Sequence, residues 1–211
     1  NSHTEWIKCV KIHNTGNNSP IKIVLLIGFK TVESFVMRIA GIPLLAGIML
    51  VAGSCVDIPK YDHAPRIEFV GIDKFDSEDK LGNPIKLVRI TVSFEDGDGD
   101  LGEDIQSEER RNFLMDNGGW GNYHVQVLRY VNEKWEPLEM SALSYLAFPY
   151  LKPDGIRGPI RGKLDYDLDF ALGAGQKDTP LKFLVKIRDR ELRESNTIET
   201  DSISVPIFDE F

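Results

Sequence analysis

The residues best suited to chemistry in this chain form one acidic run, EDGDGDLGED, at residues 95–104. Asp96, Asp98 and Asp100 alternate with glycine, which allows a tight loop to turn several carboxylates inward without steric cost. Hard oxygen ligands at this spacing suit Ca²⁺. The run departs from the EF-hand pattern, because Leu101 occupies the sixth position, where a glycine is needed. The alternative is a solvated Asp-Gly turn that follows a strand.

A further carboxylate, far along the chain, is expected near this loop. The second predicted strand, at 85–95, runs into the acidic loop, and the sixth, at 181–187, ends beside Asp189. In an immunoglobulin-like sandwich the ends of these two strands emerge at the same pole. Asp189 or Asn196 is therefore placed to complete an oxygen cage with the loop carboxylates.

Two arginines beside Asp189 support a rival interpretation. Arg188 or Arg190 would neutralise the acidic loop by bidentate pairing with Asp96 or Asp100. A calcium titration separates the two hypotheses, since the salt-bridge version predicts neither binding heat nor a thermal shift. The sequence alone leaves both open.

The elements that must position these residues are strands, because apolar and polar residues alternate with a period of two. The alternating segments lie at 67–70, 85–95, 123–131, 164–170, 181–187 and 203–207, with a hairpin partner of the third around Trp135. A surface loop is expected between the first two, at 73–84, and the stretch 103–114 is the longest amphipathic helix candidate. This pattern predicts an all-β fold, an immunoglobulin-like antiparallel β-sandwich of about seven strands. The Cys…Trp…Cys pattern of antibody domains is missing.

Three aspartates at alternate positions of one strand invite an acid–base interpretation. Asp165, Asp167 and Asp169 share one face of the segment 164–170, and its apolar residues share the other. Like charges in a row on a strand are typical of a solvated face, and they also discourage edge pairing. We therefore expect these carboxylates to be exposed.

Aromatic residues stand among glycines in the segment NGGWGNY at 117–123. Trp120 and Tyr123 could stack on a sugar ring or grip a protein partner. The alternative is that the tryptophan folds back and covers the end of the sandwich. Trp135 on the hairpin is expected to belong to the core or to cover the sheet.

The N-terminal part is organised differently. Residues 37–55, MRIAGIPLLAGIMLVAGSC, consist of a positive start, an apolar core and a small-residue exit, which is typical of a secretory signal segment. The ending AGSC resembles the lipobox of bacterial lipoproteins, in which the cysteine, here Cys55, is acylated and begins the mature chain. A single-pass membrane anchor is the alternative. We expect translation to begin at Met37, so that residues 1–36 are an upstream extension outside the fold.

The remaining boundaries follow from composition. Residues 56–65, with two prolines, are predicted to form an extended tether, and residues 66–211 the folded domain. The whole chain has 25 basic and 33 acidic residues, of which residues 1–55 hold five and two, so residues 56–211 carry a net charge of −11. This charge argues against nucleic acid as a partner.

Catalytic motifs are missing from the sequence. It contains no G-x-S-x-G elbow, no P-loop, no dinucleotide fingerprint and no H-E-x-x-H zinc motif. Beyond residue 55 the only histidines are His63 and His124, and no cysteine follows Cys55. A protein that is not an enzyme is therefore predicted, although a carboxylate-based hydrolase remains an alternative.

The whole pattern resembles a group of uncharacterised surface lipoproteins of Bacteroidota-type bacteria. The resemblance rests on Cys55, on the run VSFEDGDGDLG at 92–102 and on the closing segment 188–200, RDRELRESNTIET. It implies an outer-membrane lipoprotein facing the periplasm or the cell surface. The sequence thus predicts a lipid-anchored, non-catalytic module that binds an envelope protein or glycan. A structural, calcium-dependent adhesion or assembly module is the alternative.

Overall fold

The computed structural model describes residues 6–13, 60–140, 143–152 and 156–208. The predicted signal segment at 37–55, with Met37 and the acylated Cys55, lies outside the described residues. Among those that are described, no helix is both long and apolar enough to cross a membrane. The elements in chain order are β1 (Trp6–His13), β2 (Arg66–Glu78), β3 (Pro84–Asp96), α1 (Glu108–Asp116), β4 (Tyr123–Val131), β5 (Lys134–Leu138), β6 (Ile160–Ala171), β7 (Lys177–Ile187), β8 (Ile198–Glu199) and β9 (Ile203–Ile207).

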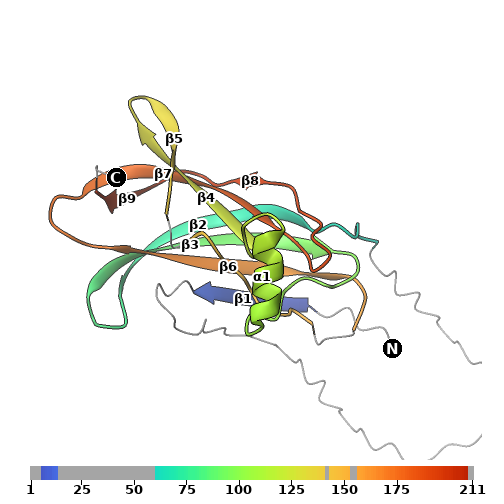
Figure 1. The fold of residues 1–211 in the computed structure, drawn as a ribbon. Helices are drawn as coiled ribbons and strands as arrows, with labels where there is room; N and C mark the ends of the chain where they lie inside the picture. Colours follow the sequence, from blue (N-terminus) through green and yellow to red (C-terminus); the bar gives the residue numbers. More distant parts are fainter. Residues whose placement is uncertain (1–5, 14–59, 141–142, 153–155, 209–211) are drawn as a thin grey trace, which may run out of the picture.

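The strands form two sheets that lie in separate layers (Figure 1). The first has the order β1-β6-β3-β2, in which β1 runs parallel to β6 and the other pairs are antiparallel. The second has the order β5-β4-β7-β8, and β9 also pairs with β7. All pairs in the second sheet are antiparallel. The prediction of an all-β, sandwich-like fold is therefore confirmed.

The core lies between the two sheets and follows from the alternation in the sequence. The central strands β3 and β7 contribute every second side chain, as a pleated strand with one inward face requires. The buried residues include Val88, Ile90, Val92 and Phe94 of β3, Leu164, Tyr166 and Leu168 of β6, and Leu181, Phe183, Val185 and Ile187 of β7. These apolar faces form one continuous core, which holds the ends of the strands in place.

Two boundaries differ from the sequence prediction. The loop expected at 73–84 is wrong for its first half, because β2 continues to Glu78 and pairs with β3 along its length. Ladder hydrogen bonds to β3 keep this polar stretch extended although its side chains are largely exposed. The helix α1 is shorter than predicted and begins where Ser107 caps it, accepting a hydrogen bond from the Arg110 backbone N–H at 3.2 Å.

One strand comes from the N-terminal part of the chain. Trp6–His13, which belong to the residues 1–36 predicted as an upstream extension, form β1 along the edge of β6. An unpaired edge offers a row of backbone donors and acceptors, and a strand satisfies them. Within the predicted tether at 56–65, the described residues begin at Lys60, and Pro65 is already buried.

The predicted solvent face of β6 is wrong for one of its aspartates. Asp167 is 1% exposed and accepts hydrogen bonds from Nε and Nη2 of Arg89 at 2.7 and 3.0 Å. Asp165 is half-buried and accepts from the Thr91 hydroxyl at 2.7 Å, whereas Asp169 is exposed. Cross-strand partners on β3 thus draw two of the three carboxylates onto the sheet.

Candidate functional site

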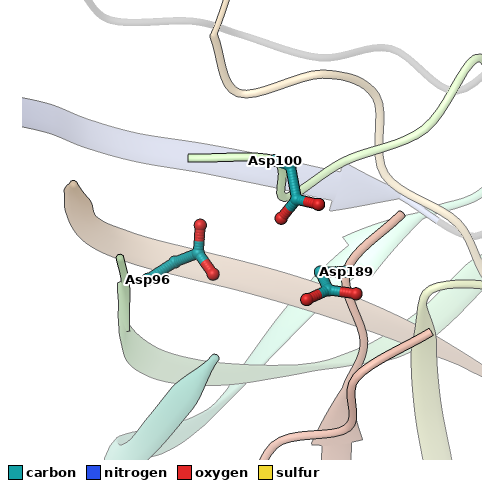
Figure 2. Close-up of side chains that lie close together, drawn as sticks. All are labelled: Asp96, Asp100 and Asp189. Atoms are coloured by element: carbon teal, nitrogen blue, oxygen red, sulfur yellow. The ribbon is translucent and has the colours of Figure 1, made fainter. Parts of the chain in front are cut away.

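Three carboxylates meet at one end of the sandwich. Asp96 is the last residue of β3, Asp100 lies in the loop that follows, and Asp189 comes two residues after the end of β7. One oxygen from each lies within 4.8 Å of the other two. Figure 2 shows the three carboxylates turned toward a common space. The expectation that the ends of the second and sixth predicted strands bring Asp189 to the acidic loop is confirmed; the term "carboxylate trio" denotes these three residues below.

The loop after β3 is shaped by glycines at close backbone approaches. Gly99 and Gly102 have φ of 75° and 96°, in the left-handed region that favours glycine. A Cβ at Gly102 would lie 2.3 Å from the Pro149 carbonyl oxygen. The Gly99 N–H donates to Asp96 Oδ2 at 2.7 Å. The alternating glycines therefore allow the chain to fold tightly around the side chain of Asp96.

The loop that carries Asp189 is closed by its own hydrogen bonds. The Arg193 N–H donates to Asp189 Oδ1 at 2.8 Å, and the Leu192 N–H donates to the Asp189 carbonyl at 3.2 Å. Leu192 adopts a φ of 67°, which turns the chain back. Asp189 is thereby held at 1% exposure, pointing toward the loop after β3.

Burial and mutual repulsion raise the pKa of these carboxyl groups. Desolvation is the main cause for Asp96, whose pKa rises to about 7, and the charges of Asp98 and Asp189 add to it. Desolvation, a hydrogen bond with Asp98 and the charge of Asp189 raise the pKa of Asp100 to about 7. Burial also raises the pKa of Asp189, although the N–H and the charge of Arg193 oppose it. The protein thus gathers negative charge where water cannot solvate it.

Part of this polar surface has no partner within the described chain. Asp96 is 0% exposed, and its Oδ1 accepts no hydrogen bond there. The Oδ1 atoms of Asp98 and Asp100 are likewise buried without a donor. A buried carboxylate oxygen without a partner costs free energy, and such groups are normally paired or coordinate a metal ion. These three oxygens without a partner all belong to the acidic loop, and those of Asp96 and Asp100 belong to the carboxylate trio.

Asp98, predicted as a calcium ligand together with the other three aspartates, lies beside the trio and not within it, and a cation of the protein binds it more closely than Asp189. Arg193 Nη1 donates to Asp98 Oδ2 at 2.8 Å and to Asp189 Oδ2 at 3.2 Å. His63 Nδ1 lies 3.1 Å from the same Asp98 oxygen. Burial acts to raise the pKa of Asp98, but the hydrogen bonds from His63 and Arg193 outweigh it and lower the pKa to about 2. Asp98 also lies close to Asp100 and Glu191, in a second, more exposed acidic group.

The predicted arginine partners of the loop lie elsewhere. Arg188 donates to backbone carbonyls and packs on Trp120, and Arg190 lies over the ring of Tyr150 at 4.9 Å. The hypothesis that either pairs with Asp96 or Asp100 is wrong, since the arginine in the acidic loops is Arg193. Sequence reasoning missed it, because the turn that brings Arg193 back to the loop depends on a positive φ at Leu192.

Two other polar residues, Asn196 and Glu103, form their hydrogen bonds with residues outside the trio. Asn196 holds the start of β2, since its Oδ1 accepts from the Ile67 N–H at 3.0 Å and its Nδ2 donates to the Ile67 carbonyl at 2.9 Å. Asn196 therefore does not complete an oxygen cage with the loop carboxylates, and that alternative of the sequence prediction is wrong. Glu103 is 1% exposed and bonds to Arg110 of α1 at 2.6 Å.

The aromatic residues proposed as a ligand platform are largely buried. Tyr123 is 0% exposed and belongs to the core, so it cannot reach a sugar or a protein partner. Trp120 is 7% exposed, with Arg188 at 4.2 Å on its ring and His124 edge-on at 5.3 Å. The structure favours the alternative in which this tryptophan covers the end of the sandwich. The ring of Trp135 on β5 lies at a tilt against the ring of Tyr130, with 5.1 Å between their centroids.

A groove of about 920 Å³ runs beside β4. Its lining includes Trp120, His124, Met140, Phe170 and Phe208, and none of the carboxylate trio. The groove is thus a separate feature from the acidic site. Compared with protein-family models, with curated proteins and with solved structures, this chain matches none.

Proposed function

We propose that this protein is a non-catalytic β-sandwich module that binds one calcium ion at its acidic pole. The observation that carries the proposal is the Oδ1 atom of Asp96, which is buried, has no partner in the described chain and belongs to a group converging with Asp100 and Asp189. A bound cation would satisfy this oxygen and offset the repulsion between the three carboxylates.

The donor set favours Ca²⁺ over other common metal ions. All three ligand groups are carboxylates, whereas zinc sites in proteins are usually built with cysteine or histidine. Calcium–oxygen bonds measure about 2.3–2.6 Å, so ligand atoms of one ion lie up to about 5 Å apart. The 4.8 Å limit on the oxygens of the trio fits that spacing. Mg²⁺ prefers a stricter octahedron with several waters, which a buried carboxylate such as Asp96 does not favour.

Burial argues for a structural ion and against hydrolysis by these carboxylates. Asp96 and Asp189 are 0% and 1% exposed, so a substrate bond could not approach both. A glycosidase, by contrast, needs its two carboxyl groups on either side of the bond that is cleaved. The ion would instead tie the end of β3 to the end of β7, and so join the two sheets.

The finer fold assignment also belongs to the proposal. Leaving β1 aside, the first, second and fifth strands of the domain (β2, β3 and β6) make one sheet. In the other sheet the third strand, β4, lies between β5 and β7, and both β8 and β9 pair with β7. This division supports an immunoglobulin-like sandwich with β5 as an additional edge strand.

The setting of the module rests on the sequence. The signal segment at 37–55 and the lipobox cysteine support a lipid-anchored protein of the bacterial envelope, attached through Cys55. In that setting the module would bind another envelope protein or a glycan. Mass spectrometry of the native protein tests the anchor: an N-terminal peptide that begins at an acylated Cys55 is expected, and an unmodified chain through residue 55 would contradict it.

Calcium binding is tested by titration calorimetry and thermal unfolding of the full chain. We expect a stoichiometry near one and a rise in melting temperature with Ca²⁺ that a chelator reverses. Asp96→Asn should abolish both effects, whereas Asp104→Asn, an exposed position of the same acidic run, should change neither. The absence of both heat and thermal shift in the unaltered protein would refute the proposal.

A further inference from the structure

A third segment lies at the acidic pole, beside the loops that follow β3 and β7. Residues 61–65, which lead into β2, lie directly against the loop after β3. The Gly97 N–H donates to the Asp62 carbonyl at 2.8 Å. A Cβ at Gly97 would lie 2.6 Å from the carbonyl oxygens of both Tyr61 and Asp62, so the two backbones touch at a point where only glycine fits.

Side chains strengthen this contact from two directions. His63 Nδ1 lies 3.1 Å from Asp98 Oδ2, on the loop after β3. Arg193 Nη1, from the loop after β7, donates to the His63 carbonyl at 3.2 Å and to the same Asp98 oxygen at 2.8 Å. The term "entry latch" denotes these contacts of residues 61–63 with Gly97, Asp98 and Arg193.

The entry latch and the carboxylate trio share their supports. Gly97 and Asp98 lie between Asp96 and Asp100, and Arg193 donates to Asp189 at 3.2 Å as well as to Asp98. Any change that separates the trio therefore displaces the groups that hold residues 61–63. Without a cation, the carboxylates of the trio crowd together in a poorly solvated place, and their repulsion favours such a separation.

Resting on the calcium site proposed above, we propose that the bound ion closes the entry latch and so fastens the segment 61–65 to the domain. The segment joins the domain to the chain that precedes residue 60, which by the sequence includes the membrane anchor. With calcium bound, the segment 61–65 would keep one fixed orientation relative to the domain. When calcium is lost, the freed residues would lengthen the connection and let the domain reorient.

The coupling must be reciprocal, and this gives a quantitative test. If calcium closes the latch by a given factor, an opened latch weakens calcium binding by the same factor. Gly97→Ala opens the latch by steric contact with residues 61–62 and removes no carboxylate from the chain. Gly71→Ala is the matched control, because a Cβ at Gly71 meets nothing within 4 Å.

The experiment combines hydrogen–deuterium exchange with calorimetry on the full chain in mild detergent, with calcium alone as the probe. In the unaltered protein and in Gly71→Ala, we expect calcium to slow amide exchange in peptides covering residues 60–66 and 96–102 at least fivefold. In Gly97→Ala we expect the protection of 60–66 to be lost and calcium affinity to fall severalfold. Asp96→Asn should show no calcium effect at all.

Failure of the latch and failure of the calcium site give different results. Calcium heat without any change in exchange at 60–66 would overturn the latch and leave the calcium site standing. The latch would also be refuted if Gly97→Ala bound calcium as tightly as the unaltered protein. No calcium heat in the unaltered protein would overturn both proposals.

Discussion

The guanidinium carbon of Arg188 lies 4.2 Å from the ring centroid of Trp120, in a side chain that is only 2% exposed. Its nitrogens donate to backbone carbonyls of the end of α1 and the loop that follows it, namely Leu114 at 2.9 Å, Asn117 at 2.5 Å, Gly121 at 2.7 Å and Trp120. The last carbonyls of a helix have no intrahelical partner and carry partial negative charge. Arg188, the first residue after β7, therefore supplies hydrogen-bond donors to carbonyls at the C-terminal end of α1.

We expect Arg188→Met to destabilise the fold by about 3 kcal/mol or more, because it leaves several buried carbonyls without a donor. Arg188→Lys should cost less, since an ammonium keeps the charge but cannot reach all four carbonyls. Urea unfolding of each variant gives the free energies. Arg111→Met is the control: this exposed arginine lies over Tyr145 at 4.8 Å, and its loss should cost less than about 1 kcal/mol. Equal costs for the two methionine variants would contradict this account.

Asp96→Asn should change stability in opposite directions with and without calcium. The amide keeps an oxygen for the Gly99 N–H and turns an NH₂ group toward the carboxylates of Asp100 and Asp189. In a chelator at pH 8, the variant should therefore be more stable than the unaltered protein, by about 1–2 kcal/mol. In calcium at a hundredfold excess over its dissociation constant, the unaltered protein gains about 2.7 kcal/mol that the variant lacks.

The measurement is urea unfolding in both conditions, and Asp104→Asn serves as the control. Asp104 belongs to the same acidic run but is exposed and outside the trio. A variant that loses stability in the chelator would mean that Asp96 is already satisfied without a cation.

Much of the fold was accessible from the sequence because alternation reports directly which face of a strand is buried. Val88, Ile90, Val92 and Phe94 predicted the inward face of β3, and all four are buried. The polar stretch that follows Gly71 in β2 could not be recognised in this way. Its side chains are largely exposed, and its strand conformation depends on pairing with β3.

The candidate site was predictable in its carboxylates but not in its cations. Strand topology brought Asp189 to the loop of Asp96 and Asp100, which follows from the order of strands in the two sheets. Which of three neighbouring arginines enters the site depends on the turn at Leu192, whose φ of 67° sends Arg193 back toward the loop. A positive φ at leucine has no sequence signal.

The pair of Arg89 and Asp167 gives a prediction for the outer face of the first sheet. Asp167 is 0% exposed at its side chain, whereas Arg89 is 25% exposed. Arg89→Met removes the two charge-assisted hydrogen bonds that this buried carboxylate accepts from the guanidinium, which we expect to cost about 3–5 kcal/mol in urea unfolding. The double variant Arg89→Met with Asp167→Leu should recover most of that loss, because both charges are then gone. A double variant that is as unstable as Arg89→Met would contradict the assignment.

His124 on β4 makes stability depend on pH near neutrality. Burial lowers its pKa from 6.5, the cation of Lys186 adds to this, and Glu194 opposes it. Between the folded and unfolded pKa the unfolded chain binds more protons, so stability is fully present above about pH 6.5 and is lost as the pH falls through the folded pKa. We expect the unaltered protein to lose more stability than His124→Gln between pH 7.5 and 5.5, measured by urea unfolding in saturating calcium. Equal losses would show that the imidazole carries no such penalty, and a larger loss in His124→Gln would reverse the sign.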